Sequence, residues 1–213
     1  MKRREFLKAG GIGLAASAVA APAIAQSMPE IKWRLAASWP KSLDTLYGGV
    51  EFFTKRVADM TDNKFQIQPF AAGEIVGGLQ VLDAVQNGTV EMGNTALYYY
   101  WGKNPAFTFG TCLPFGLNTR QHMSWMLFDG GMNMLNDLLK EYNCFGVPTG
   151  STGAQMGGWF RKEIKSPADF KGLRIRAAGF LGHIYTKLGA TPQQIAASDV
   201  YQALKKGTID AVE

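Results

Sequence analysis

Two arginines stand two residues apart in the segment FKGLRIRAAGF, residues 170–180. Apolar residues alternate with Arg174 and Arg176, the period-two pattern of a strand, so both guanidinium groups are expected on one face. Ligands of α/β sheets bind beyond the carboxyl ends of the strands, and Arg176 is nearer that end. Because a guanidinium binds a carboxylate through two parallel hydrogen bonds, Arg176 is either an anion-binding residue or half of a salt bridge. Arg174 is expected on the solvated face.

Two further segments carry groups that could contact a ligand. In GSTGAQMGGWF, residues 150–160, glycines let the backbone approach a ligand closely, and Gln155 is either a ligand contact or a hydrogen-bonded structural amide. In TALYYYWG, residues 95–102, the large aromatics cannot all face one core, so some are expected on a cleft wall and at least two in packing. These aromatics are Tyr98, Tyr99, Tyr100 and Trp101.

The sequence contains no familiar catalytic motif. Nucleophile elbows, Cys-x-x-Cys pairs, phosphate-binding glycine loops and His-x-x-x-His pairs are all missing from it, which argues against hydrolases and nucleotide enzymes. The two histidines, His122 and His183, are far apart and read as surface or packing residues. Cys112 and Cys144 could form a disulfide, but their apolar neighbours favour two small core residues.

Hydrophobic periodicity predicts an α/β fold with two lobes and a ligand cleft. Strands and helices alternate from residue 31 to residue 96, a methionine-rich helical stretch with a break at Gly130-Gly131 follows, and the alternation restarts near residue 157. We expect a first lobe over residues 26–147. Residues 148–213 are expected to form the crossover and the start of a second lobe.

Two segments of the chain match each other without gaps. VLDAVQNGTVEMG, residues 81–93, and VYQALKKGTIDAV, residues 200–212, each predict a helix, a Gly-Thr pair and a short strand with an acidic residue before it. The match is either an internal repeat or convergence on a common helix-to-strand junction.

The N-terminal residues 1–25 have the features of an export signal of the twin-arginine type. RREFLK is followed by a short apolar run and a small-x-small cleavage site before Gln26. Removing this segment lowers the net charge from +5 to +2, so no basic surface remains to suggest nucleic acid. The periplasm is the expected location.

The other end, GTIDAVE, reads as a strand that stops inside a hydrophobic run. Such an open edge is rare at the end of a natural domain. We therefore expect a C-terminal part of the second lobe beyond Glu213.

Five ordered segments resemble one known family. They are FAAGEIVGGLQVLDAVQNGTVEMG, PFGLNTRQ, TGAQMGGWFRKEI, GLRIRAAGF and ALKKGTIDAVE. Together they are similar to the solute-binding receptors of tripartite ATP-independent periplasmic (TRAP) transporters, and most closely to the branch that binds 2-oxo acids and related monocarboxylates. The resemblance covers nearly the whole chain after the signal. It implies two α/β lobes hinged around a cleft, and no enzymatic activity.

The resemblance also implies roles for individual residues. Arg176 matches the arginine that binds the ligand carboxylate, while Gln155 and Glu213 match the ligands of a metal ion, sodium for 2-oxo acids or calcium in a lactate-binding branch. Tyr98, Tyr99 and Tyr100 match residues that line the same cleft, and Phe180, at the end of the arginine segment, is a further candidate. Ser151 departs from the asparagine expected at its position.

The resulting hypothesis is an extracytoplasmic receptor for a small carboxylate such as pyruvate or lactate. Its expected partners are the small and large TRAP membrane subunits, with a homodimer formed through a C-terminal helix beyond Glu213. Two alternatives stay open: a sensory receptor, and a periplasmic enzyme on the same scaffold, which would need acid and base groups that the sequence does not display.

Overall fold

The computed structural model describes residues 29–111 and 113–213, of which Ile31–Glu213 form one compact unit. The predicted signal, residues 1–25, and Cys112 lie outside the described residues. Cys144 is a half-buried free thiol, and burial raises its pKa. Within the described ranges, no helix combines the length and the apolar character needed to cross a membrane.

The first sheet has three parallel strands in the order β2-β1-β3. The predicted alternation of strands and helices is confirmed here, and β1 is exposed over residues 31–34 and buried over residues 35–37. The elements are β1 (Ile31–Ala37), α2 (Asp44–Met60), β2 (Phe65–Phe70), α3 (Val81–Gln86) and β3 (Met92–Asn94).

Short helices follow the first sheet. The predicted break in the methionine-rich stretch is confirmed, because Gly130 adopts a φ of 84° between α4 and α5, a conformation that favours glycine. Asn118 starts α4 with a capping box formed with Gln121. The elements are the 3₁₀ turns η1 (Leu97–Tyr100) and η2 (Pro105–Gly110), α4 (Thr119–Phe128) and α5 (Gly131–Lys140).

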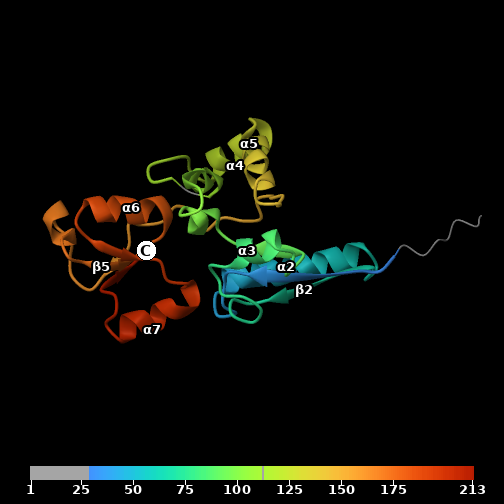
Figure 1. The fold of residues 1–213 in the computed structure, drawn as a ribbon, viewed down its shortest axis with the longest axis horizontal. Helices are drawn as coiled ribbons and strands as arrows, with labels where there is room; N and C mark the ends of the chain where they lie inside the picture. The colour runs from blue at the N-terminus through green and yellow to red at the C-terminus, as the bar shows by residue number, and fades with distance from the viewer. Residues whose placement is uncertain (1–28, 112) are drawn as a thin grey trace, which may run out of the picture. The chain divides into compact units, whose positions relative to one another are not determined.

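The second sheet has four strands in the order β4-β7-β5-β6, with β4 antiparallel to β7 and the other pairs parallel. Figure 1 shows α6 and α7 flanking this sheet, with the C-terminus beside β5. The elements are β4 (Trp159–Phe160), η3 (Pro167–Phe170), β5 (Arg174–Arg176), α6 (Gly179–Lys187), β6 (Thr191–Gln193), η4 (Ala197–Asp199), α7 (Val200–Lys205) and β7 (Ala211–Val212).

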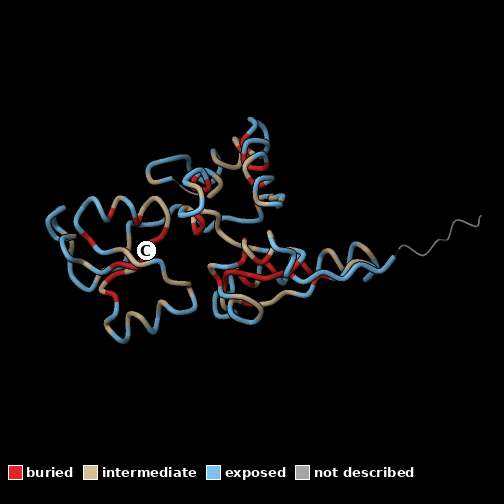
Figure 2. The backbone as a smooth tube through the Cα atoms, viewed as in Figure 1, coloured by how far each residue is buried: buried red, intermediate tan, exposed pale blue. Residues whose placement is uncertain are grey.

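Each sheet has its own apolar core. Leu35 and Phe107 belong to the larger cluster, under the first sheet, and Ile175 and Tyr185 to the cluster of the second. Figure 2 shows burial concentrated on the strands, and α7 contains no buried residue. A mixed α/β fold is thus confirmed, while the lobe boundary at residues 147–148 stays a prediction.

The two matching segments have the same local structure. Each is a helix followed by a glycine with φ near 70°, Gly88 at 70° and Gly207 at 71°, and then a strand. In each, the acidic residue before the strand forms a bidentate ion pair with an arginine of the neighbouring parallel strand. The closest contacts are 2.7 Å for Arg34 with Glu91, and 2.7 Å for Arg174 with Asp210.

The Arg34–Glu91 pair makes the stability of the first sheet depend on pH. Hydrogen bonds from Arg34 lower the pKa of Glu91 to about 2. A depressed folded-state pKa adds stability above the unfolded pKa of about 4, and this contribution is lost as the pH falls toward the folded value. The melting temperature of Glu91→Gln should therefore lie below that of the wild type at pH 7, and the gap should narrow as the pH falls below about 4 and close only below the folded pKa of about 2. A gap that is constant over this range, in calorimetric scans of both proteins, would contradict the assignment.

Candidate functional site

The two arginines of β5 have different environments. Arg174 is a surface residue, with 46% of its side chain exposed, and it pairs with Asp210. This confirms the expectation that Arg174 is a solvated or salt-bridged cation. Arg176 is only 6% exposed. A buried guanidinium is costly unless its charge and its donors are satisfied, so Arg176 is the unusual residue of this strand.

Oxygen atoms from three parts of the chain surround the Arg176 guanidinium. Nε donates a hydrogen bond to the main-chain oxygen of Ile195 at 3.1 Å, and Nη1 donates to the main-chain oxygen of Glu213. Nη2 lies 3.4 Å from the hydroxyl oxygen of Tyr99. The acceptors from Ile195 and Tyr99 are neutral groups, so they orient the guanidinium without cancelling its charge.

The carboxylate of Glu213 is the charged group nearest to Arg176. Its Oε2 atom lies 3.7 Å from Nη1, and only 12% of its side chain is exposed. Burial raises the pKa of Glu213, and the charge of Arg176 opposes this shift. Oε2 is buried without a hydrogen-bond partner among the described residues. An ion pair at this separation compensates the burial of the two charges poorly, so the pair can still accept a further anion and a further cation.

The three consecutive tyrosines do not share one environment. The rings of Tyr98 and Tyr99 meet edge to face at 4.8 Å, and Tyr99 reaches Arg176 through its hydroxyl. Burial, and next the neighbouring Tyr99, raise the pKa of Tyr98. The Tyr100 hydroxyl instead accepts from Leu82 N at 3.1 Å and meets Thr95 Oγ1 at 2.9 Å, inside the first core. The structure therefore brings Tyr98 and Tyr99, but not the hydroxyl of Tyr100, toward the arginine.

The start of α6 packs directly against Tyr98. Gly179 has φ 60°, and a Cβ atom placed on it would lie 2.9 Å from the main-chain oxygen of Tyr98. Phe180, the next residue, is half-buried, and its ring stacks on His183 with centroids 6.5 Å apart. The absent side chain of Gly179 lets the tyrosine turn and the start of α6 come together.

Replacing Gly179 by alanine should destabilise the protein by about 2–4 kcal/mol, since it combines a left-handed backbone strain with a backbone clash. Gly88→Ala is a matched control, because Gly88 has φ 70° and a Cβ there would have open space around it. The control should cost about 1 kcal/mol. Urea unfolding of both variants measures the difference, and equal losses would show that the approach to Tyr98 is unimportant.

Gln155 lies in the exposed segment 150–158, and its Nε2 donates to Thr152 Oγ1 at 2.8 Å. Ser151 contacts Thr119 at 3.0 Å between hydroxyl oxygens. The segment leads into β4, where Trp159 pairs with Val212, the residue before Glu213. Gln155 and Glu213 therefore lie on segments that meet at the β4–β7 edge, although the Gln155 side chain is hydrogen-bonded within its own loop.

Glu213 fits a cation site better than Gln155 does in this conformation. An unpartnered carboxylate oxygen is a ligand that hard cations prefer, and the Gln155 side-chain oxygen adds a neutral ligand. Among the described residues, no group of three or more His, Cys, Asp or Glu is placed to hold a metal. A cation here would depend on a single carboxylate together with neutral oxygen atoms.

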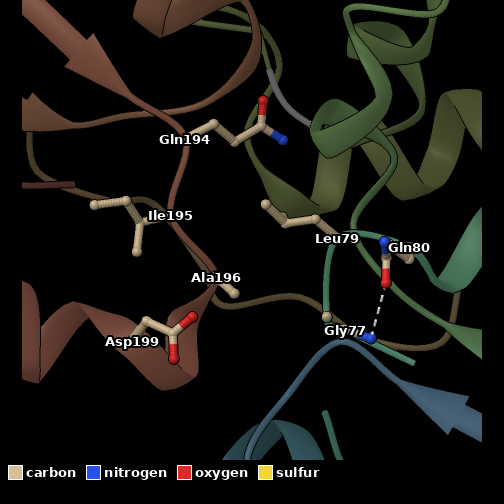
Figure 3. A pocket seen from close by; sticks show the side chains of 8 residues that line it. Gly77, Leu79, Gln80, Gln194, Ile195, Ala196 and Asp199 are labelled. Atoms are coloured by element: carbon tan, nitrogen blue, oxygen red, sulfur yellow. Dashed lines mark hydrogen bonds between the residues drawn. The ribbon is translucent and has the colours of Figure 1, made fainter. Parts of the chain in front are cut away.

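Residues 194–199 were missed by the sequence analysis. Gln194 Nε2 donates to the main-chain oxygen of Tyr99 at 2.7 Å, and Ile195 accepts from Arg176. The same segment lines one wall of a cavity of about 370 Å³. Figure 3 shows Ile195, Ala196 and Asp199 on one side, with Gly77, Leu79 and Gln80 on the other. None of the predicted site residues lines this cavity, among the residues that the structure describes.

The structure is a mixed α/β protein with two sheets. A buried arginine of the second sheet, Arg176, lies beside the carboxylate of Glu213 and the side chains of Tyr98 and Tyr99. The family comparison makes this specific. Residues 35–213 match the model of the bacterial extracellular solute-binding proteins, family 7, and the chain belongs to that family. The predicted family resemblance is confirmed.

One relative of the chain is named for the ligand class that it binds. A monocarboxylate 2-oxoacid-binding periplasmic protein of Nostoc sp. is 48% identical over 219 residues, with 100% of this chain and 60% of that protein covered. The chain thus spans about three fifths of the length of that relative.

Two of the solved structures that are similar to this chain contain a metal ion and a small carboxylate. A TRAP transporter solute-binding protein from Bordetella bronchiseptica, with copurified calcium and picolinate, has 52% identity and a TM-score of 0.85, covering 87% of this chain and 55% of that one. A TRAP periplasmic solute-binding protein from Pseudoalteromonas atlantica, with bound sodium and pyruvate, has 37% identity and a TM-score of 0.83, covering 86% and 56%.

Proposed function

We propose that the protein is an extracytoplasmic solute receptor of a TRAP transporter that binds a small organic monocarboxylate together with a cation. The observation that carries the proposal is Arg176, a guanidinium buried at the carboxyl end of β5 and surrounded mainly by neutral acceptors. Such a group recognises a carboxylate by charge and by paired hydrogen bonds. The ligand would be a 2-oxo acid such as pyruvate or a 2-hydroxy acid such as lactate.

The ligands of the two solved relatives support this choice through their shared chemistry. Pyruvate has a keto oxygen next to its carboxylate, and picolinate has a ring nitrogen in the equivalent position. Each can therefore offer a cation two donor atoms while a carboxylate oxygen faces a guanidinium. A small carboxylate with a donor atom on the adjacent position is the ligand class we propose here.

Glu213 and Gln155 are the residues that we propose to hold the cation, sodium or calcium. The cation would add charge neutralisation for the ligand's donor atoms. Arg176 orients the carboxylate, and Tyr98 and Tyr99 exclude water from one side of the guanidinium. Phe180 completes the proposed ligand contacts, whereas the Tyr100 hydroxyl is engaged within the first core and is left out of them.

The remaining features of the proposal concern the whole protein. Residues 1–25 would direct it to the periplasm, residues 26–147 would form the first lobe and residues 148–213 the start of the second. The small and large membrane subunits would recognise the form in which the lobes have closed on the ligand. A homodimer through a helix beyond Glu213 is part of the same proposal.

Calorimetry of the full chain tests this function. Pyruvate should bind in sodium or calcium chloride, and its affinity should fall when both are replaced by choline chloride with a chelator. Pyruvamide, which lacks the carboxylate, should not bind. Absence of pyruvate, lactate and picolinate binding in every salt would refute the proposal. Nuclear magnetic resonance of the same mixtures would reveal turnover, the outcome expected for an enzyme.

A further inference from the structure

Tyr185 connects the core of the second sheet to the loop that carries Gln155. It lies on α6, is 5% exposed, and packs in the same cluster as Ile175 and Ala211. Its ring stacks on Phe170 with centroids 5.4 Å apart. The hydroxyl at the tip of this fixed ring donates a hydrogen bond to the main-chain oxygen of Gly157.

The loop depends on this contact because little else holds it. Residues 150–158 have no helix or strand, and Ser151 is held through Thr119 at the first end. The other hydrogen bonds of residues 152–157 join them to Ser151 or to each other, among the described residues. At the second end, β4 pairs with β7. The hydrogen bond from the Tyr185 hydroxyl to Gly157 is therefore the contact that holds the loop next to Gln155, which precedes Gly157 by two residues.

The backbone at position 157 lies against the Tyr185 hydroxyl. A Cβ atom at this position would lie 3.9 Å from the Tyr185 hydroxyl oxygen, and the Tyr185 ring approaches from the core side. Gly158 continues the loop with φ 144°, where a Cβ would lie 3.0 Å from the main-chain oxygen of Val212. Gly158 thus lets the loop run close to the end of β7, next to the Tyr185 contact at position 157.

The charge of Glu213 also acts on the Tyr185 hydroxyl. Burial raises the pKa of Tyr185, and the negative charge of Glu213 adds to the shift. Tyr185 therefore lies within electrostatic range of one proposed cation ligand while it fixes the loop of the other. A residue in this position can set the separation between two ligands without binding the cation itself.

We propose that Tyr185 is a positioning residue for ligand binding: its hydroxyl holds the Gly157 carbonyl and thereby places Gln155 relative to Glu213. The inference rests on the proposed function, because it assigns Tyr185 to the cation-dependent part of that site. A core residue that only packs would need the ring and not the hydroxyl.

The test is Tyr185→Phe in the full chain, which keeps the ring and removes the hydroxyl. Sodium chloride or calcium chloride is titrated at fixed pyruvate, and binding is followed by calorimetry. We expect the cation concentration at half-saturation to rise about 10- to 100-fold, the usual effect of losing an outer-shell partner. Tyr142→Phe is the control, because Tyr142 packs on Phe107 in the other core and should leave the titration unchanged.

A second readout is independent of ligand. Limited proteolysis of the ligand-free protein reports on loop restraint, and cleavage next to Met156 should be several-fold faster in Tyr185→Phe than in the wild type. Unchanged cation midpoint and unchanged cleavage would overturn the inference while leaving the proposed function intact. If the wild type binds no carboxylate in any salt, the proposed function fails, and the proposed effect of Tyr185 on cation binding fails with it. The cleavage rate then shows by itself whether Tyr185 holds the loop.

Discussion

Replacing Arg176 by alanine should weaken the binding of pyruvate by at least about 30-fold, and up to the limit of detection by calorimetry. Truncating one partner of a buried, hydrogen-bonded charge pair costs about 2–5 kcal/mol. Arg176 is 6% exposed, so water cannot replace its charge at the bound carboxylate. The loss should be the same in sodium and in calcium chloride, because the substitution removes the carboxylate contact and leaves Gln155 and Glu213 in place.

Arg174 provides a matched control on the same strand. Arg174→Ala removes an equal charge from β5, but its side chain is 46% exposed and paired with Asp210. Affinity for pyruvate should change less than about threefold, since exposed ion pairs contribute about 1 kcal/mol or less. Equal losses in the two variants would mean that Arg176 acts through general charge, and unchanged affinity in Arg176→Ala would refute its role as the carboxylate-binding residue.

Glu213→Gln should have the second large effect, and it separates two roles for this carboxylate. If Glu213 is a cation ligand, the substitution removes the anionic donor, and pyruvate affinity should become independent of sodium and calcium. About 10- to 100-fold should be lost at saturating cation. If Glu213 is only the counter-charge of Arg176, 3.7 Å away, removing it frees the guanidinium and pyruvate should bind more tightly.

Pyruvate titrations of Glu213→Gln in sodium chloride, calcium chloride and choline chloride decide between these outcomes. The amide of glutamine has nearly the volume of the carboxylate, so folding should be little disturbed, and a melting curve checks this. Affinity that rises in all three salts would contradict the cation site at Glu213. Affinity that still depends on the cation would place the site on other oxygen atoms.

Much of the fold follows from local sequence patterns. The period of the apolar residues predicts the alternation of strands and helices along the chain, because burial of one face dictates that period. Gly88, Gly130 and Gly207 mark helix ends, and all three adopt positive φ. What local patterns cannot supply is the pairing of β5 with β7, which decides that Arg174 meets Asp210, 36 residues away.

The site is only partly visible in the sequence for two physical reasons. Ile195 contacts Arg176 through a main-chain oxygen, and any residue type could provide that atom. The tyrosines share a 3₁₀ turn, which directs successive side chains about 120° apart, so their identical side chains reach different surroundings. Tyr99 consequently reaches the arginine, while Tyr100 bonds within the first core.

The two matching segments have the same backbone structure, but they carry different charges at corresponding positions. Through the ladder registers, Ala36 opposite Gly93 in the first sheet corresponds to Arg176 opposite Val212 in the second. One residue further along each segment, Asn94 follows Gly93 and corresponds to Glu213, which follows Val212. Both proposed ligand-binding charges thus stand where the first half has a neutral residue. The proposed binding site therefore places its two charged side chains on a helix–glycine–strand frame that the same chain also builds with neutral residues at the equivalent positions.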